Sequence, residues 1–138
     1  MCPLSPIKAH LNATRSSIIQ TEMQEPLPNS DPALLHPLFR EKAFNLLDHL
    51  HAESIPIQLF EGFRSADRQR YLFAQGRARW NSYHQSGLAA DFALSDEKPG
   101  SWRRFQEIAE QLGLATSTSE IGHVQLAGLR CEDLAVAA

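Results

Sequence analysis

Two histidines and an aspartate stand where their side chains could do chemistry. The segment SYHQSGLAAD carries His84 into a glycine turn and then places Asp91 in an apolar run. A lone carboxylate inside a strand is costly unless its charge is compensated, and a bound cation would compensate it. Further along, in GHVQLAG, alternation puts His123 on the face opposite Val124 and Leu126.

These side chains match the ligands of a catalytic zinc site. Two neutral imidazoles and a carboxylate can hold zinc and leave a fourth position for water. Such a water needs a base nearby, and a carboxylate that is not itself a ligand can serve. Glu120 lies three residues before His123, at the start of the same segment. The residues therefore indicate a site in which His84, Asp91 and His123 bind metal and Glu120 is the base.

Each residue also has a plainer interpretation. A single histidine on a strand is more often a hydrogen-bonded structural residue than a ligand, and Asp91 could cap a turn. An iron site of two histidines and one carboxylate is a further alternative. Those sites usually have His-x-Asp spacing, whereas six residues separate His84 from Asp91. Spacing alone leaves both the presence and the identity of a metal open.

Sequence patterns mark three helical segments that could position the site. Apolar residues at helical spacing predict helices over 37–52 and 101–112. Between them, Ser65 is a typical N-cap and Gly76 a typical stop, which predicts a third helix.

Alternating apolar residues predict three strands, over 55–60, 88–94 and 122–128. Pro56 favours an edge position for the first of them. Helices and strands are mixed, with short connections of the antiparallel kind. The sequence therefore predicts an α+β fold, a small single domain with a short antiparallel sheet flanked by helices.

The composition limits the classes of protein. The chain has 138 residues, 43% of them hydrophobic and 21% charged, which is typical of one soluble globular domain. Its formal net charge of −3 argues against general nucleic-acid binding. No apolar run approaches a membrane span. The polar, proline-bearing residues 1–30 predict a loosely ordered arm before a domain over 31–138, and we interpret Cys2 and Cys131 as free thiols.

Arginines crowd into one short stretch of sixteen residues: Arg64, Arg68, Arg70, Arg77 and Arg79. They could form a solvated helix face and loop. Alternatively, they could form a wall that faces an anionic polymer or the carboxylate of a substrate.

Three motifs resemble those of a known enzyme family. SYHQSGLAADF resembles the SxHxxGxAxD segment of the zinc-dependent peptidoglycan peptidases, the VanY-like D-alanyl-D-alanine carboxypeptidases and L-alanyl-D-glutamate endopeptidases. GFRSADRQRYLFAQGRA resembles the GxRSxxxQxxLYxQGR stretch of the endopeptidase branch, and EIGHVQL the closing acid-x-x-His-x-E-L strand. The motifs occur in the family's order, over roughly residues 55–127. The resemblance implies a Hedgehog/DD-peptidase-like fold.

The resemblance also implies roles for particular residues. Glu120 corresponds to the catalytic base, and Arg64 to an arginine that helps hold the substrate and the developing oxyanion. Ser82 falls at a family serine that contacts the peptide. The zinc ligands correspond to His84, Asp91 and His123.

Other positions are structural or depart from the family pattern. Gln69 matches a glutamine for which we expect a structural role, holding the arginine loop. Gln125 stands where an acid is common. The segments 77–81 and 114–119 are shorter or different from those that normally wall the substrate cleft, which leaves the substrate specificity open.

The expected function is that of a zinc metallopeptidase that hydrolyses the stem peptide of bacterial peptidoglycan at the L-Ala–D-Glu bond. A D-Ala–D-Ala carboxypeptidase is the enzymatic alternative, although such proteins usually carry an export signal. A non-catalytic, zinc-stabilised binding module is a third possibility. Glu120 and Arg64 argue against it, because a purely structural zinc site needs neither.

The expected partner is the stem peptide, with no nucleic acid, no stable membrane insertion and a monomeric state. The first residues lack the apolar stretch of a secretory signal. We therefore expect synthesis in the cytoplasm and action on the cell wall. In this respect the chain looks similar to phage endolysins, which reach the wall after membrane disruption.

Overall fold

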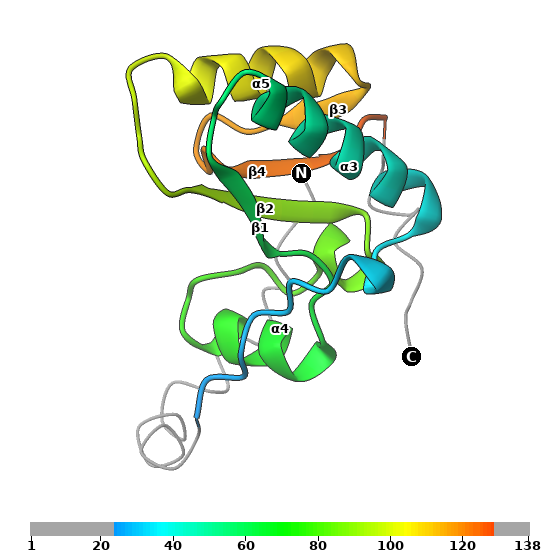
Figure 1. Ribbon diagram of the computed structural model, residues 1–138. Helices are drawn as coiled ribbons and strands as arrows, with labels where there is room; N and C mark the ends of the chain where they lie inside the picture. The colour runs from blue at the N-terminus through cyan, green and yellow to red at the C-terminus, as the bar shows by residue number, and fades with distance from the viewer. Residues whose placement is uncertain (1–23, 129–138) are drawn as a thin grey trace.

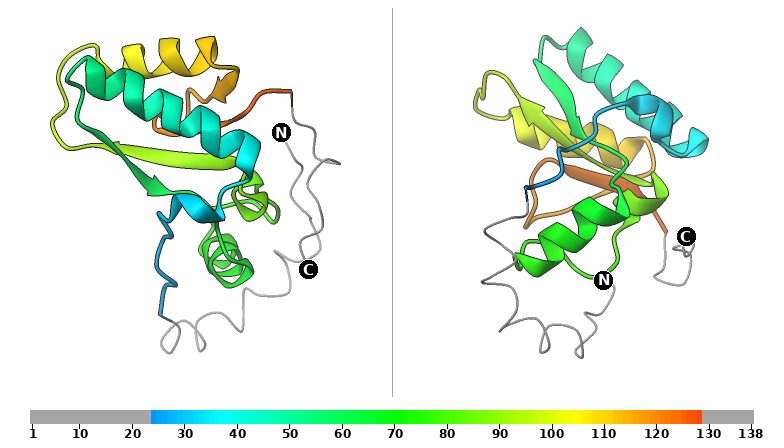
Figure 2. Two further views of the ribbon diagram at one scale, coloured as in Figure 1. Left: turned by 45° about the vertical axis from the view of Figure 1, so that its right-hand side comes forward. Right: turned by 90° about the horizontal axis from the view of Figure 1, so that it is seen from below.

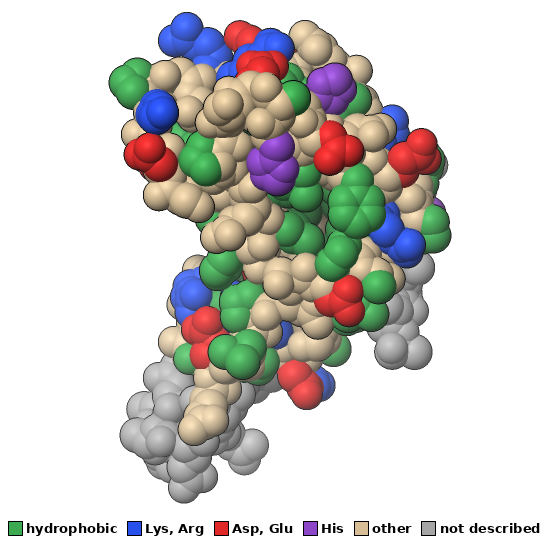
Figure 3. All heavy atoms as spheres, in the orientation of Figure 1, with side chains coloured by type: hydrophobic (Ala, Val, Ile, Leu, Met, Phe, Trp, Pro, Cys, Tyr) green, Lys and Arg blue, Asp and Glu red, His purple; other side chains and the backbone are tan. Residues whose placement is uncertain are grey.

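The computed structural model describes residues 24–128. Both cysteines, and most of the arm predicted over 1–30, lie outside the described residues. Within residues 24–128, no helix combines the length and apolar character that crossing a membrane requires. Acidic, basic and apolar side chains are interspersed over the face shown in Figure 3, as is typical of a surface in contact with water.

A four-stranded antiparallel sheet forms the centre of the fold, with strand order β1-β2-β4-β3. Its strands are β1 (Ile57–Glu61), β2 (Ala89–Leu94), β3 (Leu114–Thr116) and β4 (His123–Leu126). β1 lies at an edge, as Pro56 predicts, and starts just after that proline, which has no N–H for a ladder.

Three helices flank the sheet: α3 (Pro37–Ala52), α4 (Ala66–Ala74) and α5 (Ser101–Gln111). α3 and α5 cover one face, and α4 lies on the other side of the sheet (Figures 1 and 2). Ser65 caps α4, since its side chain accepts a hydrogen bond from Arg68 N, and Gly76 follows with φ 71°. The predicted α+β class is therefore confirmed.

The hydrophobic core lies between the sheet and helices α3 and α5. Phe105 of α5 meets Phe92 of β2 edge to face, with ring centroids 5.6 Å apart. Other buried members of this core are Phe39, Leu46, Leu50, Ile108 and Val124. The apolar stripes of both helices and one face of the strands are thus used for packing, which leaves the other sheet face to polar side chains.

Two features of the sheet differ from the sequence prediction. β3 was not predicted, because its three residues are too few to show a period. In β1 the register shifts between Leu59 and Glu61, so that Leu59 pairs with Phe92 but Glu61 pairs with Asp91. Directly paired residues share a face. The bulge therefore places Glu61 on the polar face, while Phe60 is 52% exposed.

Candidate metal site and substrate cleft

Two of the predicted ligands come from neighbouring strands. Asp91 of β2 pairs directly with His123 of β4, so both side chains project from the polar face of the sheet. The adjacent pair, Ala90 and Val124, is fully buried on the core face. The alternation of the sequence predicts this division.

The third predicted ligand, His84, lies in a 3-10 turn, η2 (Tyr83–Ser86). Ser82 caps this turn by accepting a hydrogen bond from His84 N at 3.2 Å. Gly87 ends it with φ 69°, and a Cβ there would lie 2.7 Å from His36 N, so only glycine fits. The turn brings His84, 3% exposed, beside the sheet.

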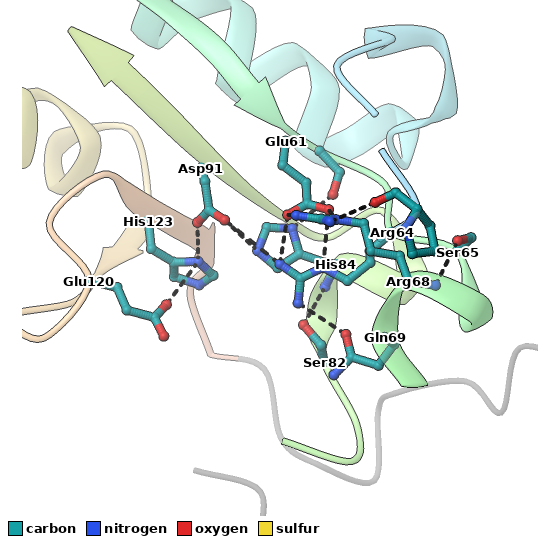
Figure 4. Close-up of polar contacts among 12 residues, drawn as sticks. Glu61, Arg64, Ser65, Arg68, Gln69, Ser82, His84, Asp91, Glu120 and His123 are labelled. Carbon is teal, nitrogen blue, oxygen red and sulfur yellow. Dashed lines mark hydrogen bonds and ion pairs between the residues drawn. The ribbon is translucent and has the colours of Figure 1, made fainter. Parts of the chain in front are cut away.

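The three side chains converge on one point (Figure 4). His84 Nε2 lies 3.3 Å from Asp91 Oδ2, and His123 Nδ1 lies 2.9 Å from Asp91 Oδ1. One ligand atom from each residue lies within 4.8 Å of the others. Residues from three separate segments therefore present two imidazoles and a carboxylate to a common volume.

Hydrogen bonds on the far side of each ring fix which nitrogen faces that volume. His84 Nδ1 is 2.8 Å from the carbonyl oxygen of Gly62. A carbonyl only accepts, so Nδ1 carries a proton, and the neutral ring then presents its Nε2 lone pair to that volume. His123 Nε2 is 2.9 Å from Gln125 Oε1, which leaves Nδ1 toward Asp91. In their neutral form, rings held in this way suit metal ligation, and the donor set fits zinc.

The electrostatics of the site favour an ionised carboxylate. Burial would raise the pKa of Asp91, but the close contacts with His123 and His84 outweigh it and hold the pKa well below its usual range. Burial lowers the pKa of His123. The contacts with Asp91 and Gln125 raise this pKa by a larger amount, so that the net shift is upward. The negative charge of Asp91 thus persists in the part-buried site and suits a cation.

Glu120 lies at the rim of this site. Its Oε2 is 3.6 Å from His123 Nδ1, and its side chain is 68% exposed. The turn that holds it is closed by a hydrogen bond from His123 N to Glu120 O at 3.0 Å. Glu120 is therefore close to the ligand group and accessible to water.

Arg64 is held in a buried network that the sequence analysis predicted only in part. Its Nε and Nη2 donate to Glu61 at 3.2 and 2.9 Å, and its Nη1 donates to Gln69 Oε1 at 3.0 Å. Its Nη2 also lies 3.8 Å from Asp91 Oδ2. Gln69 in addition donates to Arg79 O, which fits the role in the arginine loop expected for it.

Glu61 is the residue that sequence reasoning missed. It is 2% exposed and also accepts hydrogen bonds from Arg68. Burial would raise its pKa, but the bonds from Arg64 and Arg68 outweigh it, and the net pKa is lowered. Its position directly before the GFRS motif was a signal, but the bulge that turns it inward has no sequence pattern of its own.

A cleft of about 800 Å³ contains the whole group. Its lining includes the three candidate ligands, Glu120, Arg64 and Ser82. Of the arginine cluster, Arg68, Arg77 and Arg79 also line it, whereas Arg70 forms an exposed pair with Asp67. The cleft can therefore receive a ligand at the His-Asp-His group and contact it with cationic side chains.

Comparisons with known proteins find similarity to peptidoglycan enzymes. No family model matches the chain. The chain is 33% identical, over 108 residues, to the peptidoglycan L-alanyl-D-glutamate endopeptidase CwlK of Bacillus subtilis, an alignment that covers 59% of this chain and 64% of that protein. The chain thus spans less than two thirds of that curated relative.

Solved structures share the fold at low identity. The L-Ala D-Glu endopeptidase ChiX of Serratia marcescens matches with a TM-score of 0.56 and 20% identity, over 80% of this chain and 94% of that one. VanYB in complex with D-alanine-D-alanine matches with a TM-score of 0.59 and 15% identity, over 78% and 80% of the two chains. A VanY D,D-pentapeptidase in complex with Zn(II) matches with a TM-score of 0.57 and 16% identity, over 68% of this chain and 73% of that one.

The resemblance noted in the sequence is therefore confirmed: the chain is similar in sequence to a peptidoglycan endopeptidase and has the fold of the VanY-like peptidoglycan peptidases.

Proposed function

We propose that this protein is a zinc metallopeptidase that hydrolyses the stem peptide of bacterial peptidoglycan. The observation that carries the proposal is the convergence of His84, Asp91 and His123, with ligand atoms within 4.8 Å, in a cleft that also contains Arg64 and Glu120. A purely structural site would need only the ligands. The similarity to CwlK and the Zn(II) complex of VanY support the choice of substrate and metal.

The chain's own residues would hold the metal through His84 Nε2, His123 Nδ1 and the Asp91 carboxylate. Zinc in such a site supplies Lewis-acid polarisation of a carbonyl and activation of water. Gly62 O and Gln125 keep both imidazoles in the ligating tautomer and orientation.

Glu120 is the proposed base. Its exposed carboxylate lies at the rim beside His123, where it can take a proton from the attacking water and deliver it to the leaving amine. It stands outside the group of ligand atoms that lie within 4.8 Å of one another. This arrangement separates proton transfer from metal binding.

Arg64 is the proposed partner of the oxyanion. Its described hydrogen bonds, to Glu61 and Gln69, use three of the five N–H groups of a guanidinium. The remaining N–H groups belong to Nη1 and Nη2, and Nη2 lies on the side of Asp91. Because the network fixes the guanidinium before substrate arrives, little reorganisation is needed when charge develops on the scissile carbonyl oxygen.

The L-Ala–D-Glu bond is the preferred scissile bond, because CwlK and ChiX are both named as endopeptidases of that specificity. Cleavage at D-Ala–D-Ala is the second candidate, supported by the complex of VanYB with D-alanine-D-alanine. Ser82, on the cleft wall, is proposed to contact the peptide. The site of action would be the cell wall.

Digestion of purified cell wall tests this proposal. The zinc-loaded protein is incubated with wall, and new termini are identified by mass spectrometry, with Glu120→Gln as the matched control. New amino-terminal D-Glu supports the endopeptidase, and free D-Ala the carboxypeptidase. Stoichiometric zinc without any new terminus would contradict catalysis and favour a binding module.

A further inference from the structure

A carboxylate of the chain itself lies between two arginines of the cleft wall. Glu25 belongs to the segment that precedes α3 and runs beside α4 (Figures 1 and 2). Its Oε1 lies 2.6 Å from Arg77 Nη1, and its Oε2 lies 3.1 Å from Arg68 Nη1. Each oxygen of one carboxylate is thus bound by a different guanidinium.

Both arginines also line the cleft that contains His84, Asp91 and His123. Arg68 is divided between two partners: its Nε and Nη2 donate to buried Glu61, whereas its Nη1 donates to Glu25 and to Pro26 O. Glu61 also forms an ion pair with Arg64. Without Glu25, Arg64 and Arg68 would share the single negative charge of Glu61, and Arg77 would lose its carboxylate partner. This end of the cleft would then carry excess positive charge and favour an incoming anion.

The ion pair between Glu25 and Arg77 is exposed enough for another carboxylate to replace Glu25. The side chains of Glu25 and Arg77 are 36% and 53% exposed, and exposed ion pairs contribute little free energy because water competes for both groups. The backbone of the segment is tied to the domain at two further points, by Arg68 Nη1 to Pro26 O at 2.7 Å and by Gly62 N to Asn29 O at 2.8 Å. The Glu25 carboxylate can therefore be displaced while the backbone of the segment stays attached at Pro26 and Asn29.

We propose that Arg68 and Arg77 form a carboxylate subsite of the cleft, that Glu25 fills it in the free protein, and that a carboxylate of the substrate takes its place. The inference rests on the proposed function for the identity of the substrate. A guanidinium pair binds a carboxylate through charge-assisted hydrogen bonds and gains much less from a neutral amide. The subsite therefore selects stem peptides whose carboxylates are not amidated.

A stem peptide with lysine as its third residue offers two such groups, the free carboxylate of its D-Glu residue and its C-terminal carboxylate. Three synthetic peptides distinguish them: L-Ala-γ-D-Glu-L-Lys, the same peptide amidated at D-Glu, and the same peptide amidated at the C-terminus. Binding of each is measured by isothermal titration calorimetry, separately from hydrolysis. If amidation of one carboxylate weakens binding relative to the unmodified peptide, that carboxylate is the one that occupies the subsite.

The variants are Glu25→Gln and Arg77→Gln, with Arg70→Gln as the matched control. Arg70 lies on α4 and pairs with an exposed carboxylate, Asp67, but it is not part of the cleft lining. Arg68 is left unchanged, since its loss would remove a partner from buried Glu61.

Removal of the competing carboxylate in Glu25→Gln should tighten binding of the acidic peptide by about 3- to 10-fold. Arg77→Gln should weaken it by a similar factor and abolish the preference for acid over amide. Arg70→Gln should behave as the wild type. Thermal unfolding of each variant separates these effects from loss of fold.

Unchanged or weaker binding in a folded Glu25→Gln protein, or an undiminished acid preference in Arg77→Gln, would overturn the proposal. Binding that shows no dependence on either carboxylate would also overturn it. Carboxylate-dependent binding without hydrolysis would instead contradict the proposed enzyme and leave the subsite in place.

Discussion

Asp91 and His123 lie directly opposite each other on neighbouring antiparallel strands, and His123 Nδ1 is 2.9 Å from Asp91 Oδ1. The register of β2 and β4 alone therefore brings together two of the three candidate metal ligands. Only His84 must be brought in by a separate turn.

His84→Ala and His123→Ala should each lose both zinc and peptidase activity, because two remaining ligands hold zinc poorly. Elemental analysis of the purified proteins measures the metal. His49→Ala is the control, since His49 lies on the exposed side of α3. Stoichiometric zinc in either of the first two variants would exclude the altered residue from the ligand set.

Gln125→Ala should weaken zinc binding by about 10- to 100-fold, because it removes the group that orients His123 through Nε2. Gln125→Glu can still accept the Nε2 hydrogen and should retain zinc. Competition with a chromogenic chelator measures both affinities. Equal affinity in Gln125→Ala and the wild type would show that β4 orients the imidazole without this contact.

Arg64→Lys should lower turnover while metal content stays unchanged, because lysine keeps the charge but loses the planar fork that Glu61 and Gln69 hold in place. Steady-state hydrolysis of a soluble stem peptide, with zinc measured on the same preparation, checks this. Turnover equal to that of the wild type would remove Arg64 from the mechanism.

Glu61→Gln should destabilise the fold, because it leaves Arg64 and Arg68 buried without their shared carboxylate. Breaking a buried pair in this way costs about 3–5 kcal/mol. Urea unfolding measures the change in free energy of unfolding. Glu53→Gln, which alters an exposed pair with Arg104, is the control and should change little. Equal effects of the two substitutions would argue that burial of Glu61 is unimportant.

The parts of the site with local sequence patterns could be predicted. Alternation separated His123 from the core residue Val124, and the Ser65 cap located α4 and with it the arginine loop. The contacts that depend on distant segments could not. Glu25 meets Arg77 across 52 positions, and no period or motif in the sequence connects them.

Irregular backbone explains the other features of the site that could not be predicted from the sequence. The bulge in β1 that buries Glu61 changes the register by one residue, and residues 59–61 themselves contain no glycine or proline. Ser82 matched the family motif as a substrate contact, but its hydroxyl also caps the turn that holds His84. Its proposed contact with the peptide remains a prediction.

Glu120 is proposed to transfer protons and not to bind metal, and the substitution Glu120→Gln separates these two roles. Glutamine keeps the size of the side chain but cannot accept the proton of the attacking water. Zinc stoichiometry and wall hydrolysis are measured on the same preparation of the variant. We predict full zinc occupancy with hydrolysis reduced by about a hundredfold to ten-thousandfold. Near-normal hydrolysis would contradict the role as base, and lost zinc would make Glu120 a ligand.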